Sequence, residues 1–170
     1  VSGQIYAKQL EFYIDAMDVA DEDVYCDKTR LNQVLMNLLS NAIKFTPAGG
    51  TVSMQVRQLA GKVGGYGQYE FRVKDSGIGM SREFAKKIFE PFERERTSTV
   101  SRIQGTGLGM AITKNIVDMM GGTIDVQSAP EKGTEFIVCI PLRARAEDRK
   151  TVKITRLEGL KALVVDDDFN

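Results

Sequence analysis

The sequence predicts one main domain of the mixed α/β class, on three observations. The chain has 170 residues, 42% hydrophobic and 27% charged, which is typical of globular proteins and excludes disorder over its whole length. Several segments alternate apolar with polar residues, which predicts strands. Others repeat apolar residues every three or four positions, which predicts helices with one buried face. A chain of this length buries roughly 70% of its unfolded surface, so one core suffices without disulfides.

A strand and a long helix are predicted first. Leu10, Phe12 and Ile14 alternate with polar residues, as in a strand. Asp27 is a suitable N-cap for a helix that we expect to reach about Phe45. The apolar positions of this helix, spaced as one buried face, are Leu31, Val34, Leu35, Leu38, Leu39 and Ala42. The helix therefore has a face that must pack on a core.

The middle of the chain predicts two strands, a short helix and a loop. The strands are expected at 52–56 and 69–73, joined by a loose loop that contains several glycines. The helix is expected at 82–89, ended by Pro91. Residues 94–107 are polar and show no period, which indicates a loop.

The last third predicts a helix at 108–120 and strands at 123–128 and 134–141. Residues 143–158 begin with a run of charges, which indicates a linker. Residues 159–170 contain an apolar, strand-like segment followed by three aspartates. We therefore expect a second domain to begin there and to be truncated.

Charge and residue counts exclude several kinds of function. Lys plus Arg number 23 and Asp plus Glu 23, so the net charge is zero and no nucleic-acid partner is expected. The chain has no histidine, which excludes Ser-His-Asp catalysis, His-ligated zinc and a phosphohistidine on this chain itself. Cys26 and Cys139 lack the spacing of a metal site. No run of 18 apolar residues occurs, so we expect a cytoplasmic location. The full-length protein can still be anchored to a membrane by another segment.

Two glycine-rich segments are candidates for binding a phosphorylated ligand. Asp-Ser-Gly-Ile-Gly-Met at 75–80 follows a predicted strand, and Gly-Thr-Gly-Leu-Gly at 105–109 opens a predicted helix. Glycine lets a backbone approach a ligand closely, and the amides at a helix N-terminus attract phosphate. Neither segment is a P-loop, because no Gly-Lys-Ser/Thr follows. Taken singly, each is explained equally well by a plain turn or cap.

Polar side chains on the first long helix are a second candidate. Asn37, Asn41 and Lys44 fall at i, i+4 and i+7, which places them on one stripe beside the apolar face. An amide oxygen can ligate Mg²⁺ and a lysine can meet phosphate. On pattern alone, a solvated polar edge of the helix explains the stripe better.

Two further groups have equally open interpretations. Asp75 ends a strand, where a carboxylate can accept a hydrogen bond from an exocyclic amine, or where Asp before Ser-Gly can simply form a turn. Arg94, Arg96 and Arg102 lie in the polar loop and can reach phosphates, although solvated loop charges explain each one equally well.

Together these segments resemble the ATP-binding catalytic domain of two-component sensor histidine kinases, a branch of the larger GHKL family of gyrase, Hsp90, histidine kinase and MutL ATPases. Leu31–Thr46 (LNQVLMNLLSNAIKFT) resembles the N box, and 75–80 (DSGIGM) the first glycine box. Phe89–Phe92 (FEPF) resembles the F box, 105–110 (GTGLGM) the second glycine box and 133–134 the last. The boxes occur in the family's order over about residues 5–142.

The resemblance implies a two-layer α/β (α+β) sandwich, the Bergerat fold, with a mixed, mostly antiparallel sheet covered on one face by three helices. It implies that the domain binds ATP with Mg²⁺ and donates the γ-phosphoryl group to a histidine on a separate dimerisation domain. A nucleotide-binding regulatory module without catalysis and a hydrolysing ATPase of the family are the alternatives. The intact boxes argue against the regulatory module.

The resemblance also implies roles for single residues. Asn41 would coordinate Mg²⁺, Lys44 would contact phosphate, Asp75 would bind the adenine amino group, and Arg94 would approach the γ-phosphate from a lid at 94–107. Asn37, Lys44 and Arg94 would be the catalytic residues. The nucleotide-binding residues implied are Asn37, Asn41, Lys44, Asp75, Gly77, Ile78, Gly79, Gly105, Thr106, Gly107, Leu108, Gly109 and Thr134.

Position 37 separates the branches of the family. Hydrolysing members place a glutamate four residues before the Mg²⁺-binding asparagine, as a general base for water. Asn37 occupies that position here and cannot take a proton. The resemblance therefore favours a kinase, which keeps ATP intact until a partner nucleophile arrives.

The resemblance implies a hybrid sensor kinase as the parent protein. We expect the catalytic domain at 1–142, the linker at 143–158 and the start of a receiver domain at 159–170, where Asp166 and Asp167 match Mg²⁺-binding acids of receivers. The expected partners are ATP, the phosphoacceptor and dimerisation domain of the same protein, and the receiver domain. The fragment is expected to be a monomer and the full-length protein a homodimer.

Overall fold

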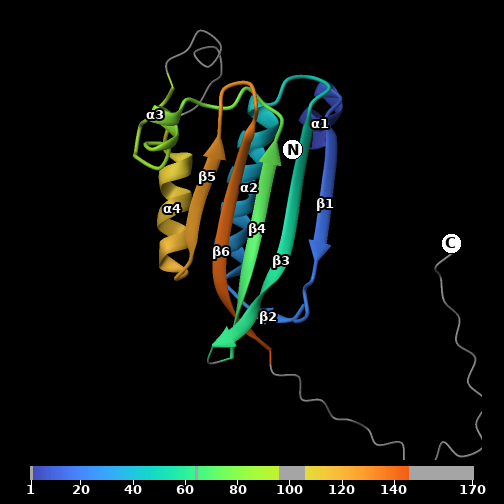
Figure 1. Cartoon of the computed structure of the whole chain (residues 1–170), viewed down its shortest axis with the longest axis vertical. Coiled ribbons are helices and arrows are strands. Elements are labelled where there is room, and N and C mark those ends of the chain that lie inside the picture. Colours follow the sequence, from blue (N-terminus) through green and yellow to red (C-terminus); the bar gives the residue numbers. More distant parts are fainter. Residues whose placement is uncertain (1, 64, 96–105, 146–170) are drawn as a thin grey trace, which may run out of the picture.

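The computed structural model describes residues 2–63, 65–95 and 106–145 (Figure 1), and it confirms the predicted mixed fold. The described residues form a six-stranded sheet and helices of very different lengths. In chain order the elements are α1 (Ser2–Lys8), β1 (Glu11–Met17), β2 (Val24–Tyr25), α2 (Lys28–Phe45), β3 (Thr51–Val63), β4 (Tyr66–Asp75), α3 (Arg82–Ala85), α4 (Gly109–Met119), β5 (Thr123–Ser128) and β6 (Thr134–Ala144).

The sheet is mixed and mostly antiparallel, as predicted. Its strands follow the order β1-β3-β4-β6-β2, and β5 also pairs with β6. Only the β1–β3 pair is parallel among the described strands. The register places Asp75, at the end of β4, opposite Thr134, at the start of β6. Two segments that are distant in sequence therefore meet at one end of the sheet.

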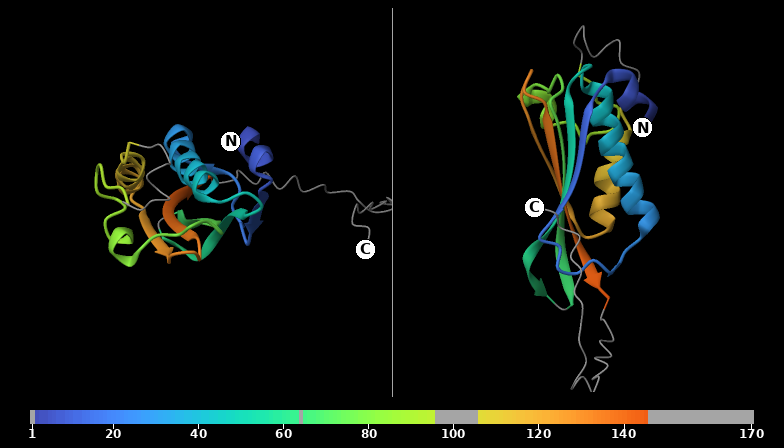
Figure 2. Two further views of the ribbon diagram at one scale, coloured as in Figure 1. Left: turned by 90° about the horizontal axis from the view of Figure 1, so that it is seen from above. Right: turned by 90° about the vertical axis from the view of Figure 1, so that its right-hand side faces the viewer.

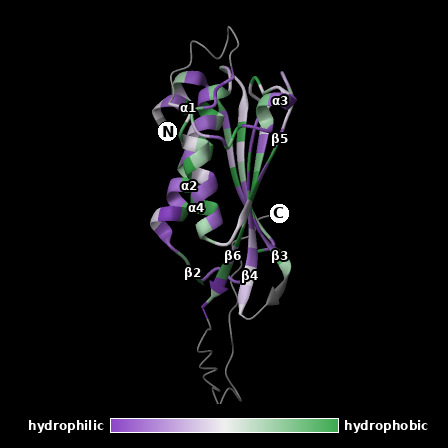
Figure 3. Cartoon of the chain, turned by 90° about the vertical axis from the view of Figure 1, so that its left-hand side faces the viewer, coloured by the Kyte–Doolittle hydropathy of each residue, from purple (hydrophilic) through white to green (hydrophobic). Residues whose placement is uncertain are grey.

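Two long helices, α2 and α4, form the second layer on one face of the sheet (Figure 2). The Asp27 side chain caps α2 as predicted, since its Oδ1 accepts from the Arg30 N–H at 3.0 Å. Val34 and Leu38 of α2 and Val117 of α4 are fully buried against the sheet. The hydrophilic residues of both helices lie on the side away from the sheet (Figure 3). The predicted amphipathic faces thus build the core.

The expected third helix of this layer is much shorter than predicted. Of the segment 82–89, only Arg82–Ala85 is α-helical, and turns follow it. This α3 lies beside β5, whereas α1 lies next to β1 at the other edge (Figure 1). The Ser81 side chain accepts from the Phe84 N–H at 3.2 Å and caps the single turn.

The predicted loose loop between 56 and 69 is wrong. β3 and β4 pair as far as Val63 and Tyr66, with a register shift between Leu59 and Lys62. Gly65, at φ 82°, occupies the short turn that joins them. Ladder pairing therefore continues through residues whose polar and glycine-rich character suggested a loop.

β6 is longer than predicted. It continues past 141 to Ala144, because Arg143 and Ala144 pair with the short strand β2. Both residues therefore belong to the sheet and not to the expected linker. The rest of that linker, the expected receiver segment at 159–170 and most of the expected lid lie outside the described residues.

No helix in the described part of the chain combines the length and the apolar character needed to span a bilayer.

Candidate functional site

A pocket of about 290 Å³ lies where the C-terminal half of α2 meets the ends of β4 and β6 and the start of α4. Most of the predicted site residues converge on it, although they come from segments up to 97 positions apart, from Asn37 to Thr134. The predicted site residues that line the pocket are Asn37, Asn41, Lys44, Asp75, Ile78, Gly79, Arg94, Thr106, Gly107, Gly109 and Thr134.

Two predicted residues, Gly77 and Leu108, are not among the lining residues. The Gly77 N–H donates to Oδ1 of Asp75 at 2.8 Å, so this amide is used inside the protein. The Leu108 N–H points to Oγ1 of Thr106 at 3.4 Å. Gly105 lies outside the described residues. The N–H groups of Gly77 and Leu108 thus both lie near acceptors in their own loops.

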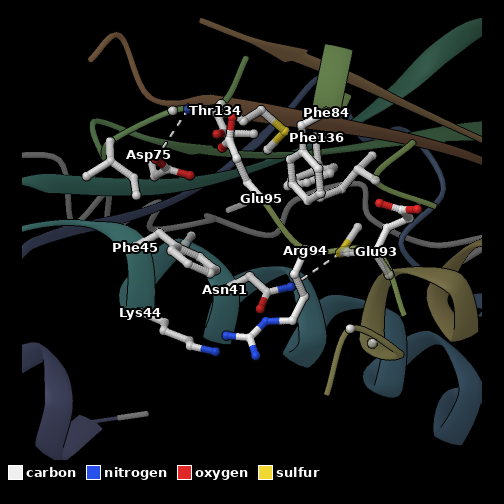
Figure 4. A pocket seen from close by; sticks show the side chains of 18 of the residues that line it. Asn41, Lys44, Phe45, Asp75, Phe84, Glu93, Arg94, Glu95, Thr134 and Phe136 are labelled. Atoms are coloured by element: carbon white, nitrogen blue, oxygen red, sulfur yellow. Dashed lines mark hydrogen bonds between the residues drawn. The ribbon is translucent and has the colours of Figure 1, made fainter. Parts of the chain in front are cut away.

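The carboxyl group of Asp75 lies at the sheet end of the pocket (Figure 4). Asp75 is only 7% exposed, and the N–H groups of Gly77 and Thr134 both donate to Oδ1, at 2.8 and 3.2 Å. Burial raises the pKa of Asp75 to about 6, against the lowering by these two bonds. Because both donors bind Oδ1, the Oδ2 atom remains as an acceptor for a ligand in the pocket.

The backbone around this carboxyl group leaves no room for larger residues. Gly79 has φ 63°, and a Cβ there would collide with the carbonyl group of Ala129. The Ser128 hydroxyl lies 3.0 Å from Oγ1 of Thr134 and accepts from the Met80 N–H at the same distance. The glycine segment is therefore fixed to the β5–β6 turn, which shapes one wall of the pocket.

The opposite end of the pocket carries positive charge and an amide. Lys44 and Arg94 approach each other there, near Asn41 (Figure 4). Burial lowers the pKa of Lys44, and the nearby charge of Arg94 lowers it further. The Lys44 ammonium lies 5.1 Å from the centre of the Phe45 ring. Two cations held close together would be stabilised by an anionic ligand.

Asn41 and Asn37 use their amide nitrogens to contact α4. Nδ2 of Asn41 lies 3.2 Å from Sδ of Met110, and Nδ2 of Asn37 donates to Oγ1 of Thr113 at 2.6 Å. A Cβ at Gly109 would lie only 2.8 Å from Oδ1 of Asn37, so a larger residue there would require the Asn37 amide to shift. The amide oxygen of Asn41 is not used by its contact with Met110.

Part of the pocket lining consists of residues that the motifs do not predict. Apolar side chains cover one side, and two acidic residues follow the F box. Oε1 of Glu95 accepts from the Ser81 N–H at 2.9 Å. The missed lining residues are Ala42, Phe45, Met80, Phe84, Ile88, Glu93, Glu95, Met110 and Phe136. Several of them lie inside or next to the boxes, which was the available signal, but their periodicity only indicated a core.

This fold and this pocket define a nucleotide-binding domain of a known class. Residues 26–144 match the sequence model of the family described as histidine kinase-, DNA gyrase B-, and HSP90-like ATPase. The chain belongs to this family.

Within the family, the chain is similar to sensor kinases. It is 35% identical over 170 residues to the autoinducer 2 sensor kinase/phosphatase LuxQ of Vibrio parahaemolyticus, covering 95% of this chain and 20% of LuxQ. It is 35% identical over 161 residues to the sensor protein GacS of Pseudomonas syringae pv. syringae, covering 95% of this chain and 18% of GacS. The chain thus spans about a fifth of the length of these curated relatives.

Solved structures of histidine kinases have the same fold. The structure of full-length ShkA in complex with AMPPNP matches with a TM-score of 0.68 and 29% identity, over 85% of this chain and 28% of ShkA. The nucleotide-free catalytic domain of the histidine kinase ThkA matches with a TM-score of 0.65 and 32% identity, over 82% of this chain and 84% of that domain.

Proposed function

We propose that this domain binds ATP with Mg²⁺ and donates the γ-phosphoryl group to a histidine on a separate domain. The observation that carries the proposal is the polarity of the pocket. A buried carboxyl group lies at one end and two cations lie at the other. ATP has the complementary polarity, with an amino group on its base and negative charge on its phosphates.

At the sheet end, Oδ2 of Asp75 would accept from the exocyclic amino group of adenine. Thr134 and Ile78 line this end, and the missed apolar residues Met80 and Phe136 offer surface for the flat base. Gly77, which we had also expected to bind the nucleotide, would act indirectly by orienting the Asp75 carboxyl group.

At the other end, Lys44 and Arg94 would meet the phosphates, together with the amides of Gly107 and Gly109 at the start of α4. The described residues contain no cluster of three or more acidic, cysteine or histidine side chains that could hold a metal by itself. Mg²⁺ in nucleotide sites is usually held by one or two protein groups, by phosphates and by water. The oxygen of Asn41 fits this requirement, and the ion would neutralise phosphate charge.

Transfer would depend on positioning and on charge. Lys44 and Arg94 would stabilise the negative charge on the transferring group, while the pocket fixes its direction. Asn37 cannot act as a general base for water, because an amide takes up no proton at neutral pH. The attacking histidine must come from another domain, because this chain contains none.

We also propose two partner domains for this chain. A phosphoacceptor domain that also dimerises would supply the histidine, and a receiver domain would accept the phosphoryl group afterwards. Support comes from the relatives: LuxQ is named a sensor kinase/phosphatase, and ThkA has been solved in complex with a response regulator protein, TrrA. This function places the domain in the cytoplasm, where ATP is available.

Calorimetric titration of ATP, with and without Mg²⁺, tests the proposal. We expect saturable one-to-one binding that Mg²⁺ strengthens. Asp75→Asn should weaken it about tenfold, because the two backbone donors would hold the amide oxygen and turn the NH₂ group toward the adenine amine.

Asp118→Asn is the matched control, because Asp118 is exposed and its carboxylate pairs with Lys114, far along α4 from its start at the pocket. It should bind ATP like the wild type. If the folded wild-type chain does not bind ATP, the proposed function is wrong. Equal weakening by both variants would contradict the role of Asp75.

A further inference from the structure

The short helix α1 is fastened to the end of α2 by one side chain, Lys8. Its Nζ atom donates to the carbonyl oxygens of Ile43, Lys44 and Thr46, at 2.8, 2.9 and 2.8 Å. An ammonium group has three hydrogen-bond donors, so Lys8 uses all of them on this one turn of the chain. The contact joins residues that are 35 to 38 positions apart.

These carbonyl groups are the ones that the end of a helix leaves without partners. The Ala42 carbonyl accepts from the N–H and the hydroxyl group of Thr46, and the Phe45 carbonyl accepts from the Ile78 N–H at 3.3 Å. Lys8 supplies the donors for the remaining carbonyls of this turn. Its positive charge also lies at the end of α2 where the helix dipole favours a cation.

The turn that Lys8 holds lies at the positively charged end of the pocket. Asn41, Lys44 and Phe45 all line the pocket, and the carbonyl of Lys44 itself is one of the acceptors for Lys8. Ile78, which donates to Phe45, belongs to the glycine segment that forms the opposite wall. The position of the Lys44 side chain is therefore set by contacts that include Lys8.

Lys8 is itself held in place. Its carbonyl accepts from the Gly49 N–H at 2.9 Å, and the Leu10 N–H donates to Ile5 at 3.0 Å. Ile5 is partly buried against the core, whereas its neighbour Tyr6 is 83% exposed. Among the described residues, the hydrogen bonds from α1 to the end of α2 come from the Lys8 side chain.

We propose that Lys8 is a positioning residue for the phosphates of the nucleotide. It holds the last turn of α2 in the arrangement in which Lys44 and Asn41 meet the phosphate groups, so that attachment of α1 and binding of phosphate are coupled. The inference rests on the proposed function and deepens it, because it assigns α1 a part in the same site. The hydrogen bonds that hold the Asp75 carboxyl group come from Gly77 and Thr134 and do not involve this turn.

The test separates the two ends of the ligand. Lys8→Met keeps the length of the side chain and removes its donors, and Lys8→Arg restores charge and donors. We expect Lys8→Met to weaken ATP binding about tenfold, which corresponds to a loss of about 1.4 kcal/mol of binding free energy. Adenosine has no phosphates, so its binding should weaken less than twofold. Lys8→Arg should recover most of the ATP affinity.

Lys114→Met is the matched control, because it removes an exposed ammonium with one ion-pair partner and should change neither affinity. Hydrogen exchange without nucleotide provides a second readout. In Lys8→Met, the amides of Thr46 and Ile78 should exchange faster than in the wild type. If Lys8→Met does not fold, Lys8→Gln, which keeps two donors without charge, replaces it and should weaken ATP binding by less than tenfold while adenosine binding changes less than twofold.

Three results would overturn the proposal. The first is that the amides of Thr46 and Ile78 exchange at the wild-type rate in Lys8→Met. The second is an equal loss of ATP and adenosine binding, and the third is a lowered free energy of unfolding with no change in ATP affinity. Either of the last two would mean that Lys8 only stabilises the fold. If the wild type binds no ATP, the proposed function fails, and Lys8 then has no phosphate to position.

Discussion

Burial of the Asp75 carboxyl group destabilises its ionised form but strengthens its hydrogen bond to a ligand. Its carboxyl group is buried at the end of β4, where burial raises its pKa to about 6, so the empty pocket holds an ionised group at a cost at neutral pH. The same burial makes the carboxylate a strong acceptor for a ligand amine, because water does not compete. A residue placed only for stability would not be an acid here.

The stability of the ligand-free domain should therefore report on Asp75. The folded-state pKa of this acid is raised above its ordinary value of about 4, so its stabilising contribution is complete below about pH 4 and is lost as the pH rises through about 6. Asp75→Asn removes this titration. The free energy of unfolding of the wild type minus that of Asp75→Asn should fall by about 2 kcal/mol between pH 4 and pH 7, measured by urea denaturation.

All other titrating groups cancel in this difference. Asp118→Asn, at an exposed position, should give a difference from wild type that is nearly constant over the same range. A flat difference for Asp75→Asn would show that its carboxyl group is not desolvated in the folded domain. A difference that rises with pH would show that the two backbone donors outweigh burial.

At the scale of elements, a hydrogen bond joins α2 to α4 at the pocket, in addition to the contact of Asn41 with Met110. Nδ2 of Asn37 donates to Oγ1 of Thr113 at 2.6 Å, and Thr113 is only 1% exposed. Thr113→Val should leave the Asn37 amide without this acceptor and lower the free energy of unfolding by about 1–2 kcal/mol. Chemical denaturation of the ligand-free domain measures this loss.

Thr113→Ser is the control, because it keeps the hydroxyl group and removes only a methyl group. It should retain the hydrogen bond and should lose less stability than Thr113→Val. If Thr113→Val is as stable as the wild type, the contact between the helices contributes nothing, and the position of Asn37 must be set by its packing against Gly109.

The elements that the sequence predicted well are those whose periodicity extends over many residues. The apolar face of α2 and the alternation in β4 and β6 could be recognised because burial imposes a repeated pattern. β2 has two residues, too few for any period, and exists through its pairing with the end of β6. α1 depends on bonds from Lys8 to a distant helix, which no local pattern records.

The site residues, like the elements, were predicted in part from sequence spacing. The spacing of Asn37, Asn41 and Lys44 placed them on one stripe, and all three line the pocket. The resemblance also implies that Gly77 and Leu108 bind the nucleotide, which stays a prediction, since neither lines the pocket and the N–H of each lies near an acceptor in its own loop. Competition between ligand and protein for a backbone donor depends on local geometry, which a motif does not specify.

The whole molecule places the pocket at one end of the two layers, where the ends of α2, β4 and β6 come together (Figure 1). The start of α4 and the residues around Arg94 complete its margin. A nucleotide bound there would have its base toward the sheet and its phosphates toward the helices. This arrangement can hold ATP, but it brings no nucleophile to the γ-phosphate from the described residues.

The chain should therefore bind ATP without consuming it. With γ-labelled ATP and Mg²⁺, the chain alone should release phosphate only at background rate, because position 37 carries an amide and not a general base. It should acquire no acid-labile label, since it has no histidine. Addition of a histidine-bearing dimerisation domain from a related kinase should give label on that domain, at a rate that Asp75→Asn lowers.

The control is the same domain with its histidine replaced, which should remain unlabelled. Steady phosphate release by the chain alone would assign it to the hydrolysing branch of its family, in spite of Asn37. ATP binding without transfer to any histidine domain would instead describe a regulatory nucleotide-binding module. Transfer that requires both ATP-loaded chain and intact histidine would establish that the pocket delivers phosphate to a partner, as its charge distribution and its missing base both indicate.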